Sequence, residues 1–183
     1  MTKVIVTDIF GRTPALEDLA KAVGSVAEII DPYDKKSMKF TAEPRAYAYF
    51  MAQVGIPSYE QQVAARLAEI PKIDLLIGFS VGAAAIWGIS NTLAPEKVDR
   101  AVCFYGSQIR HAADIIPRIP MDHILPRKEP GLDVDAVAEI LSGNPAVTIH
   151  KTPFLHGFMN RLSPNFSRSG YDVWLERLRR NRL

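Results

Sequence analysis

The chain has 183 residues, 48% of them hydrophobic and 23% charged, which suits one soluble domain whose core needs no disulfide or metal. The net charge of +2 is too small to indicate a nucleic-acid partner. Cys103 is the single cysteine, which excludes an intrachain disulfide and favours a reducing compartment. Because no apolar run reaches membrane-spanning length, we expect a cytoplasmic protein that binds no membrane.

The first thirty residues predict a strand, a helix and a second strand. A β-rich run covers residues 3–7, and Pro14 opens a helix over 15–23 in which apolar residues recur at helical spacing. Gly24 ends this helix, and a second strand follows at residues 25–30. Such a unit forms a parallel pair of strands.

The middle of the chain repeats this alternation. Residues 33–40 are polar and predict a loop, and residues 44–54 and 58–70 predict two helices. We expect Gly55-Ile56-Pro57 to separate these helices, because glycine and proline both interrupt helical structure. An apolar run that starts at Leu75 then predicts the third buried strand.

The third strand leads directly into Gly78-Phe79-Ser80-Val81-Gly82, and small residues that predict a helix follow. A strand, Gly-x-Ser-x-Gly and a helix in this order are the layout of a nucleophile elbow. The strand and the helix approach so closely that only glycine fits at 78 and 82, and the strained serine lifts its hydroxyl out of the turn. The N–H of Val81 can then stabilise an oxyanion. The alternative is a tight turn whose serine only caps the helix.

The remaining elements predict an α/β fold in one domain over residues 1–183, without repeats or linkers. The segment 108–119 shows no clean period and is expected to be a loop with at most a helical turn. The other expected elements are strands at 98–104, 120–125 and 146–150, a helix that Asp133 caps and that reaches Leu141, a loop at 151–169 and an amphipathic helix at 171–180.

Ser80 needs a base and an orienting acid, because a serine hydroxyl is by itself a weak nucleophile. Functional groups of parallel sheets lie at the carboxyl ends of strands. Ser80 follows the third predicted strand, Glu129 the fifth and His156 the sixth, which is the chain order serine, acid, histidine. The other histidines lie within predicted strands or in the uncertain segment: His111, His123 and His150.

The acid has more than one candidate. Glu129 lies in a proline-flanked loop after a strand, Asp133 has a competing role as a helix cap, and Asp122 lies within a strand. We favour Glu129 and keep Asp133 as the alternative. No cluster of metal-ligating residues has suitable spacing, so we expect no metal or cofactor.

The loop after the first strand must pass beside the elbow, so it is expected to supply a second oxyanion donor. The backbone N–H of Ile9 is our choice. Asp8 would then place a carboxylate near Ser80, and Arg12 or Arg45 is expected to pair with it, because a buried carboxylate needs a partner.

These segments resemble the dienelactone hydrolase family of α/β-hydrolases along nearly the whole chain. Asp8-Ile9-Phe10-Gly11 is similar to the family's Glu-Ile-Phe-Gly, and Gly78–Gly82 stands where the family has Gly-x-Cys-x-Gly. Residues 101–106 are similar to its next strand, and His156-Gly157-Phe158-Met159-Asn160 to its histidine motif. The resemblance implies a three-layer fold of about six mostly parallel strands with helices on both faces, and the Ile9 N–H as an oxyanion donor.

The chain also departs from the family pattern. Serine replaces the cysteine nucleophile, which removes the argument for a dienelactone substrate, and Glu129 stands where the family usually has aspartate. The chain starts at the family's third strand, so an exposed sheet edge makes a homodimer plausible. The family's substrate-carboxylate arginines have no matched positions, which leaves Arg12 and Arg45, together with Tyr105 and Asp8, as candidates for substrate contacts.

We therefore expect a carboxylic ester or lactone hydrolase that acts on a small molecule through an acyl-enzyme on Ser80. His156 would act as base and then acid, Glu129 would orient it, and the N–H groups of Ile9 and Val81 would hold the oxyanion. The alternatives are a hydrolase-like binding protein without turnover and an acyltransferase.

Overall fold

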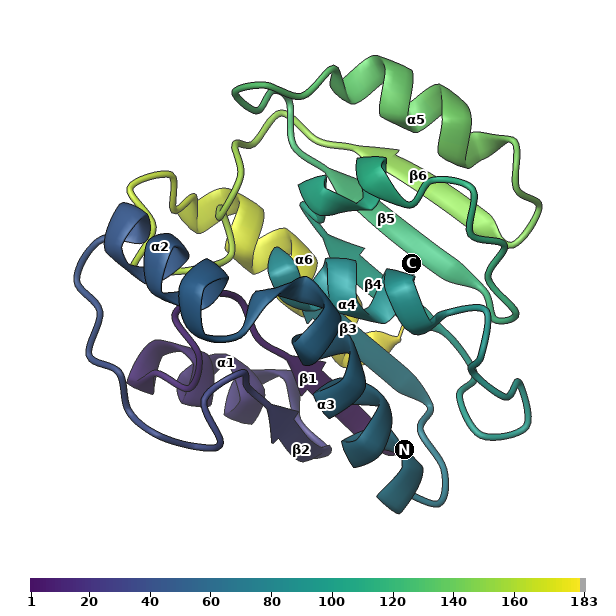
Figure 1. Cartoon of the computed structure of the whole chain (residues 1–183), viewed down its shortest axis with the longest axis horizontal. Coiled ribbons are helices and arrows are strands. Elements are labelled where there is room, and N and C mark those ends of the chain that lie inside the picture. Colours follow the sequence, from purple (N-terminus) through teal and green to yellow (C-terminus); the bar gives the residue numbers. More distant parts are fainter. Residues whose placement is uncertain (182–183) are drawn as a thin grey trace.

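The computed structural model describes residues 1–181, which form one sheet of six parallel strands in the order β2-β1-β3-β4-β5-β6 (Figure 1). The strands are β1 (Lys3–Val6), β2 (Val26–Ile30), β3 (Leu75–Phe79), β4 (Ala101–Phe104), β5 (Met121–Leu125) and β6 (Val147–Lys151). The predicted fold class, an α/β sheet of about six parallel strands with helices on both faces, is confirmed.

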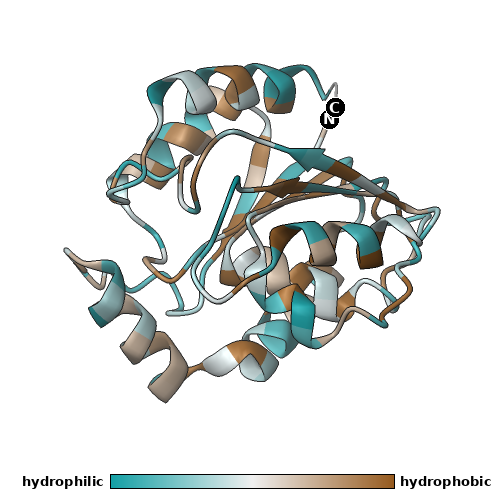
Figure 2. Cartoon of the chain, turned by 90° about the horizontal axis from the view of Figure 1, so that it is seen from above, coloured by the Kyte–Doolittle hydropathy of each residue, from teal (hydrophilic) through white to brown (hydrophobic). Residues whose placement is uncertain are grey.

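Helices cover both faces of this sheet, which Figure 2 shows edge-on between two helical layers. The helices are α1 (Pro14–Val23), α2 (Glu43–Gln53), α3 (Gly55–Glu69), α4 (Val81–Ile89), α5 (Val134–Ser142) and α6 (Arg168–Arg180), together with the 3-10 helix η1 (Ser107–His111). Side chains of α1 and α6 pack on one face, and those of α3 and α4 pack on the other.

The distribution of apolar residues explains which strands lie in the middle of the sheet and which lie at its edges. All residues of β1, β3, β4 and β5 are buried, and alternate side chains enter the two cores. Such strands need nearly continuous apolar runs because both of their faces are covered. The edge strands β2 and β6 are only partly buried, and β5 is fully buried although it contains Asp122 and His123.

Three predicted element boundaries were wrong. Helix α3 begins at Gly55, and Pro57 lies in its first turn, where the missing N–H of proline removes no helical hydrogen bond. Helix α6 begins at Arg168, three residues before the expected start, because the Ser167 hydroxyl accepts a hydrogen bond from the Gly170 N–H. Strand β4 begins at Ala101, and Val98 forms only an isolated bridge with Ile73.

The buried ammonium group of Lys3 joins the two helices on one face to the sheet. Its Nζ donates to the carbonyls of Val23 and Leu178 at 3.0 Å and of Arg179 at 3.2 Å. These carbonyls lie at the carboxyl ends of α1 and α6, where a positive charge is favourable. Among the helices of residues 1–181, none combines the length and the apolar character that crossing a membrane requires.

Candidate active site

Ser80 lies between β3 and α4 in a strained backbone conformation, with φ 52° and ψ −115°. Such a conformation costs about 1–3 kcal/mol in a residue other than glycine. A Cβ atom at Gly78 would lie 2.7 Å from the Cα of Ala83, and one at Gly82 would lie 2.4 Å from the carbonyl oxygens of Val6 and Thr7. The motif therefore needs both glycines for close packing of the helix start against β1 and β3.

The Ser80 hydroxyl makes no capping hydrogen bond to α4. Instead its Oγ lies 3.1 Å from Nε2 of His156, whose Nδ1 lies 3.0 Å from Oε2 of Glu129. The three side chains come from loops after β3, β5 and β6. A carboxylate at Nδ1 stabilises the tautomer that presents the Nε2 lone pair to the hydroxyl. The His156 and Glu129 side chains are 26% and 14% exposed, so water screens this arrangement only partly.

The other candidate acids are engaged elsewhere. Asp133 accepts hydrogen bonds from the N–H groups of Asp135 and Ala136 and caps α5. Asp122 is buried in β5, pairs with Arg100 and accepts a 2.7 Å hydrogen bond from His150. Within the described chain, Glu129 is thus the carboxylate that contacts the His156 ring.

The loop that carries His156 is held in place on several sides. Asn165 donates a 3.0 Å hydrogen bond to the His156 carbonyl, and the Tyr105 ring packs against the imidazole with 4.8 Å between centroids. Gly157 has φ +83°, and a Cβ atom there would lie 2.5 Å from the Ser163 hydroxyl. The buried Tyr105 itself has a positive φ of 42° at the end of β4. Tyr105 therefore lies at the site and packs directly against the histidine ring, and its predicted contact with substrate stays a prediction.

A cavity of about 600 Å³ opens in front of Ser80 and His156, and Ile9 and Val81 also line it. This volume is typical of small-molecule sites. Val81 is the first residue of α4, so its N–H has no acceptor within its own helix. The predicted oxyanion residues thus lie beside the serine from two separate loops.

The carboxylate of Asp8 lies at the same cavity and accepts hydrogen bonds from the Phe10 N–H at 2.9 Å and from Asn160 Nδ2 at 2.6 Å. Desolvation raises the pKa of Asp8 to about 6, although these hydrogen bonds and the nearby His156 favour the charged form. The partner of Asp8 is therefore a neutral amide.

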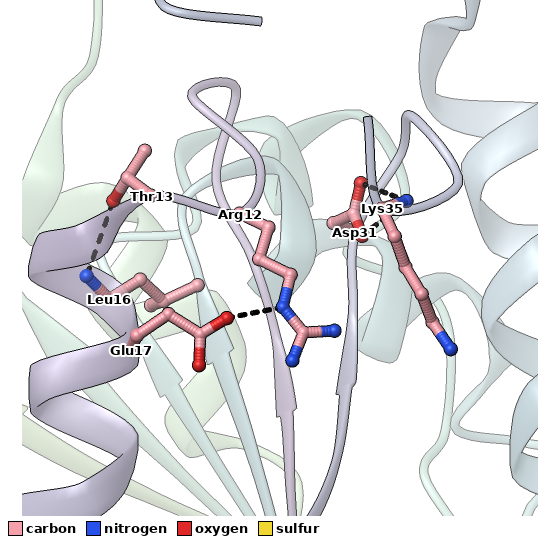
Figure 3. Close-up of polar contacts among 6 residues, drawn as sticks. All are labelled: Arg12, Thr13, Leu16, Glu17, Asp31 and Lys35. Atoms are coloured by element: carbon pink, nitrogen blue, oxygen red, sulfur yellow. Dashed lines mark hydrogen bonds and ion pairs between the residues drawn. The ribbon is translucent and has the colours of Figure 1, made fainter. Parts of the chain in front are cut away.

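The expectation that Arg12 or Arg45 would pair with Asp8 was wrong. Arg12 Nε binds Glu17 at 2.5 Å (Figure 3), and Arg45 is exposed on α2. Neither arginine lines the cavity in front of Ser80. Arg12 and Arg45 were expected as partners of Asp8 only because of their positive charge. The actual partner, Asn160, is neutral and ends the His156–Asn160 motif.

One wall of the cavity consists of residues that were not singled out individually from the sequence, although they fall within the ranges 33–57 and 107–120, where the walls of the pocket were expected. This wall comes from the start of α2 and from the region of η1, and its residues are Glu43, Pro44, Tyr47, Ser107, Gln108 and Arg110. They lie in the two segments whose periodicity is weakest. The described residues contain no group of three or more side chains that could hold a metal ion.

No protein-family model matches the chain. Among curated proteins, the uncharacterized protein YczH of Bacillus subtilis (strain 168) is 38% identical over 96 residues, which are 51% of this chain and 46% of that protein. The match therefore spans about half the length of each protein.

Solved structures are similar over nearly the whole chain. The dienelactone hydrolase-like promiscuous phosphotriesterase P91 from metagenomic libraries is 17% identical, with a TM-score of 0.69 over 97% of this chain and 84% of that chain. Dienelactone hydrolase from Anabaena variabilis ATCC 29413 is 16% identical, with a TM-score of 0.63 over 96% and 84%. A cold-adapted esterase from an Arctic intertidal metagenomic library is 16% identical, with a TM-score of 0.60 over 96% and 82%.

The chain therefore has the α/β-hydrolase fold, in the form that dienelactone hydrolase-like proteins and esterases adopt.

Proposed function

We propose that this protein is a serine hydrolase that cleaves a carboxylic ester or lactone through an acyl-enzyme on Ser80. The observation that carries this proposal is the chain of contacts from Ser80 Oγ to His156 Nε2 at 3.1 Å and from His156 Nδ1 to Glu129 at 3.0 Å. These contacts lie at a cavity large enough for a small ester. A serine that only capped α4 would need neither the strained backbone nor the imidazole.

In the first half-reaction, Ser80 Oγ bonds to the carbonyl carbon while its proton moves to His156 Nε2. The negative charge passes to the carbonyl oxygen, where the N–H groups of Ile9 and Val81 stabilise it. When the intermediate collapses, the bond to the alkoxy oxygen breaks and this oxygen takes the proton from His156. In the second half-reaction His156 takes a proton from water while the water oxygen bonds to the acyl carbon. The bond from this carbon to Ser80 Oγ then breaks, Oγ takes the proton back from His156, and the acid leaves. Glu129 stabilises the imidazolium in both halves.

The activities named for the solved neighbours support this reaction class. The neighbours include a dienelactone hydrolase and an esterase. The single cysteine, Cys103, is buried and free, which fits the cytoplasmic location that we propose.

The test is covalent labelling with a fluorophosphonate probe, read by intact-protein mass spectrometry. We expect one adduct on the wild-type protein and none on Ser80→Ala. Ser107→Ala is the matched control, because Ser107 is a second serine that lines the same cavity. We expect the Ser107→Ala protein to carry the same single adduct as the wild-type protein. If the wild-type protein is not labelled at any pH, the protein is a binding module without turnover. Product analysis with competing alcohols distinguishes hydrolysis from acyl transfer.

A further inference from the structure

Helix α2 is apolar on a side that faces solvent. It buries only Ala46 and Phe50, and the Phe50 ring packs against Tyr59 of α3. Exposed apolar residues recur on another side at the spacing i, i+3, i+4, i+7, i+8. This exposed row, the α2 stripe, consists of Pro44, Tyr47, Ala48, Met51 and Ala52.

The α2 stripe contrasts with ordinary surface helices. Tyr47 is 42% exposed and Met51 is 48% exposed, whereas an apolar stripe on a globular helix normally faces a core. Tyr49 is different, because its ring packs against Tyr33 and Phe40. The stripe is thus an apolar surface that the described part of the chain leaves uncovered.

The stripe is continuous with the cavity in front of Ser80. Pro44 and Tyr47, its first two members, line that cavity together with Ser80 and His156. From Pro44 to Ala52 the helix rises roughly 12 Å, at 1.5 Å per residue. An extended group bound at Ser80 can therefore pass from the cavity onto the outer part of α2.

The charges around the cavity disfavour an anionic group on that path. The carboxylates of Asp8 and Glu43 line the cavity together with Pro44 and Tyr47, and Asp8 has a neutral amide as its partner. Arg110, which lines the cavity from η1, donates to the Ser107 carbonyl. A substrate carboxylate near α2 would meet like charges, whereas an uncharged alkyl group would not.

We propose that the substrates are uncharged esters whose alkyl chain leaves the cavity along the α2 stripe, with Tyr47 and Met51 as specificity-determining residues. This inference rests on the proposed function, because Ser80 must attack the ester carbonyl for the chain to lie there. The alkyl chain of the substrate belongs either to the acyl side or to the alkoxy side of the ester.

The experiment measures kcat/KM over two series: p-nitrophenyl acetate, butyrate, hexanoate and octanoate for the acyl side, and alkyl acetates of the same lengths for the alkoxy side. Full burial of a methylene corresponds to about a fourfold gain. A one-sided apolar surface should give about half of that free energy, so we expect roughly a twofold rise per methylene in one of the series.

The double variant Tyr47→Ser/Met51→Gln should flatten this rise, so that the ratio of octanoate to acetate falls about tenfold. The matched controls are Ile140→Gln on α5 and Val173→Thr on α6, two exposed apolar residues, 59% and 51% exposed, that lie outside the cavity. Each control should keep the wild-type ratio. Thermal unfolding of every variant verifies that it folds.

Four results would overturn the inference. An unchanged chain-length ratio in the double variant, or a wild-type rate that falls with chain length, would contradict it while the hydrolase assignment stands. A concentration-dependent dimer that Met51→Gln dissociates would show that a second copy covers the stripe. Turnover of no ester at all, acetate included, with no labelling of Ser80 would reject the proposed function and this inference with it.

Discussion

The side-chain amide of Asn160 donates a 2.6 Å hydrogen bond to the carboxylate of Asp8, 152 positions earlier in the chain. This bond joins the loop after β1, which carries Ile9, to the loop after β6, which carries His156. The two halves of the candidate site therefore have a direct mechanical connection. Among residues 1–181 Asp8 forms no ion pair with a basic side chain, and the burial of its carboxylate has a measurable consequence.

We predict that Asp8→Asn changes the pH dependence of stability. The pKa of Asp8 is raised to about 6 from 3.8, mainly by desolvation. Its contribution to folding is thus fully present below pH 3.8 and is lost as the pH rises through about 6. Relative to wild type, the variant should gain stability between pH 4 and pH 8, by at most about 3 kcal/mol. Urea unfolding at pH 4 and pH 8 measures the free energy of unfolding of both proteins. An equal change between the two pH values in wild type and Asp8→Asn would contradict the prediction.

We predict that Glu129→Gln lowers kcat for ester hydrolysis by about 10² to 10⁴-fold, because an amide cannot stabilise the imidazolium and favours the wrong tautomer of His156. Asp133→Asn is the matched control, since asparagine caps a helix as well as aspartate does. It should leave kcat unchanged. Steady-state kinetics of both variants decides between the two acids, and a larger loss in Asp133→Asn would reject Glu129.

We predict that Gly82→Ala destabilises the protein by more than about 3 kcal/mol, because the new methyl group would lie 2.4 Å from two backbone oxygens of β1 and its loop. Gly143→Ala provides the comparison. Gly143 has helical backbone angles, φ −67° and ψ −13°, and the nearest atom to its Cβ position is 3.4 Å away. That change should lie within about 0.5 kcal/mol of wild type. Denaturant unfolding measures the free energy of unfolding of both variants. Equal losses of stability would show that the start of α4 can move away from β1 without cost.

We predict that Lys3→Met destabilises the protein by about 2–3 kcal/mol, because it removes the donor shared by three carbonyls at the ends of α1 and α6. Lys72→Met removes an exposed pair with Asp99 and should change stability by less than about 1 kcal/mol. Chemical unfolding of the two variants gives the comparison. A smaller loss of stability in Lys3→Met than in Lys72→Met would contradict this prediction, because it would mean that water hydrogen-bonds the three carbonyls as well as the ammonium group does.

The sequence by itself determined the sheet and the candidates for the site. Strands that are buried on both faces need nearly continuous apolar runs, so β1, β3 and β4 could be recognised locally, and parallel strands bring the residues that follow them to one edge. Glycine at positions 78 and 82 could likewise be explained before any coordinates, since the requirement for close backbone approach lies within the motif.

Only the tertiary structure decided which groups meet. The choice of Glu129 over Asp133 as the neighbour of His156, the Asp8–Asn160 hydrogen bond and the placement of α2 beside the cavity depend on how loops that are far apart in the sequence lie relative to one another. No local pattern of residue types encodes such relative positions, because they result from the packing of all the elements together. Residue chemistry thus restricted the candidates, and the fold selected among them.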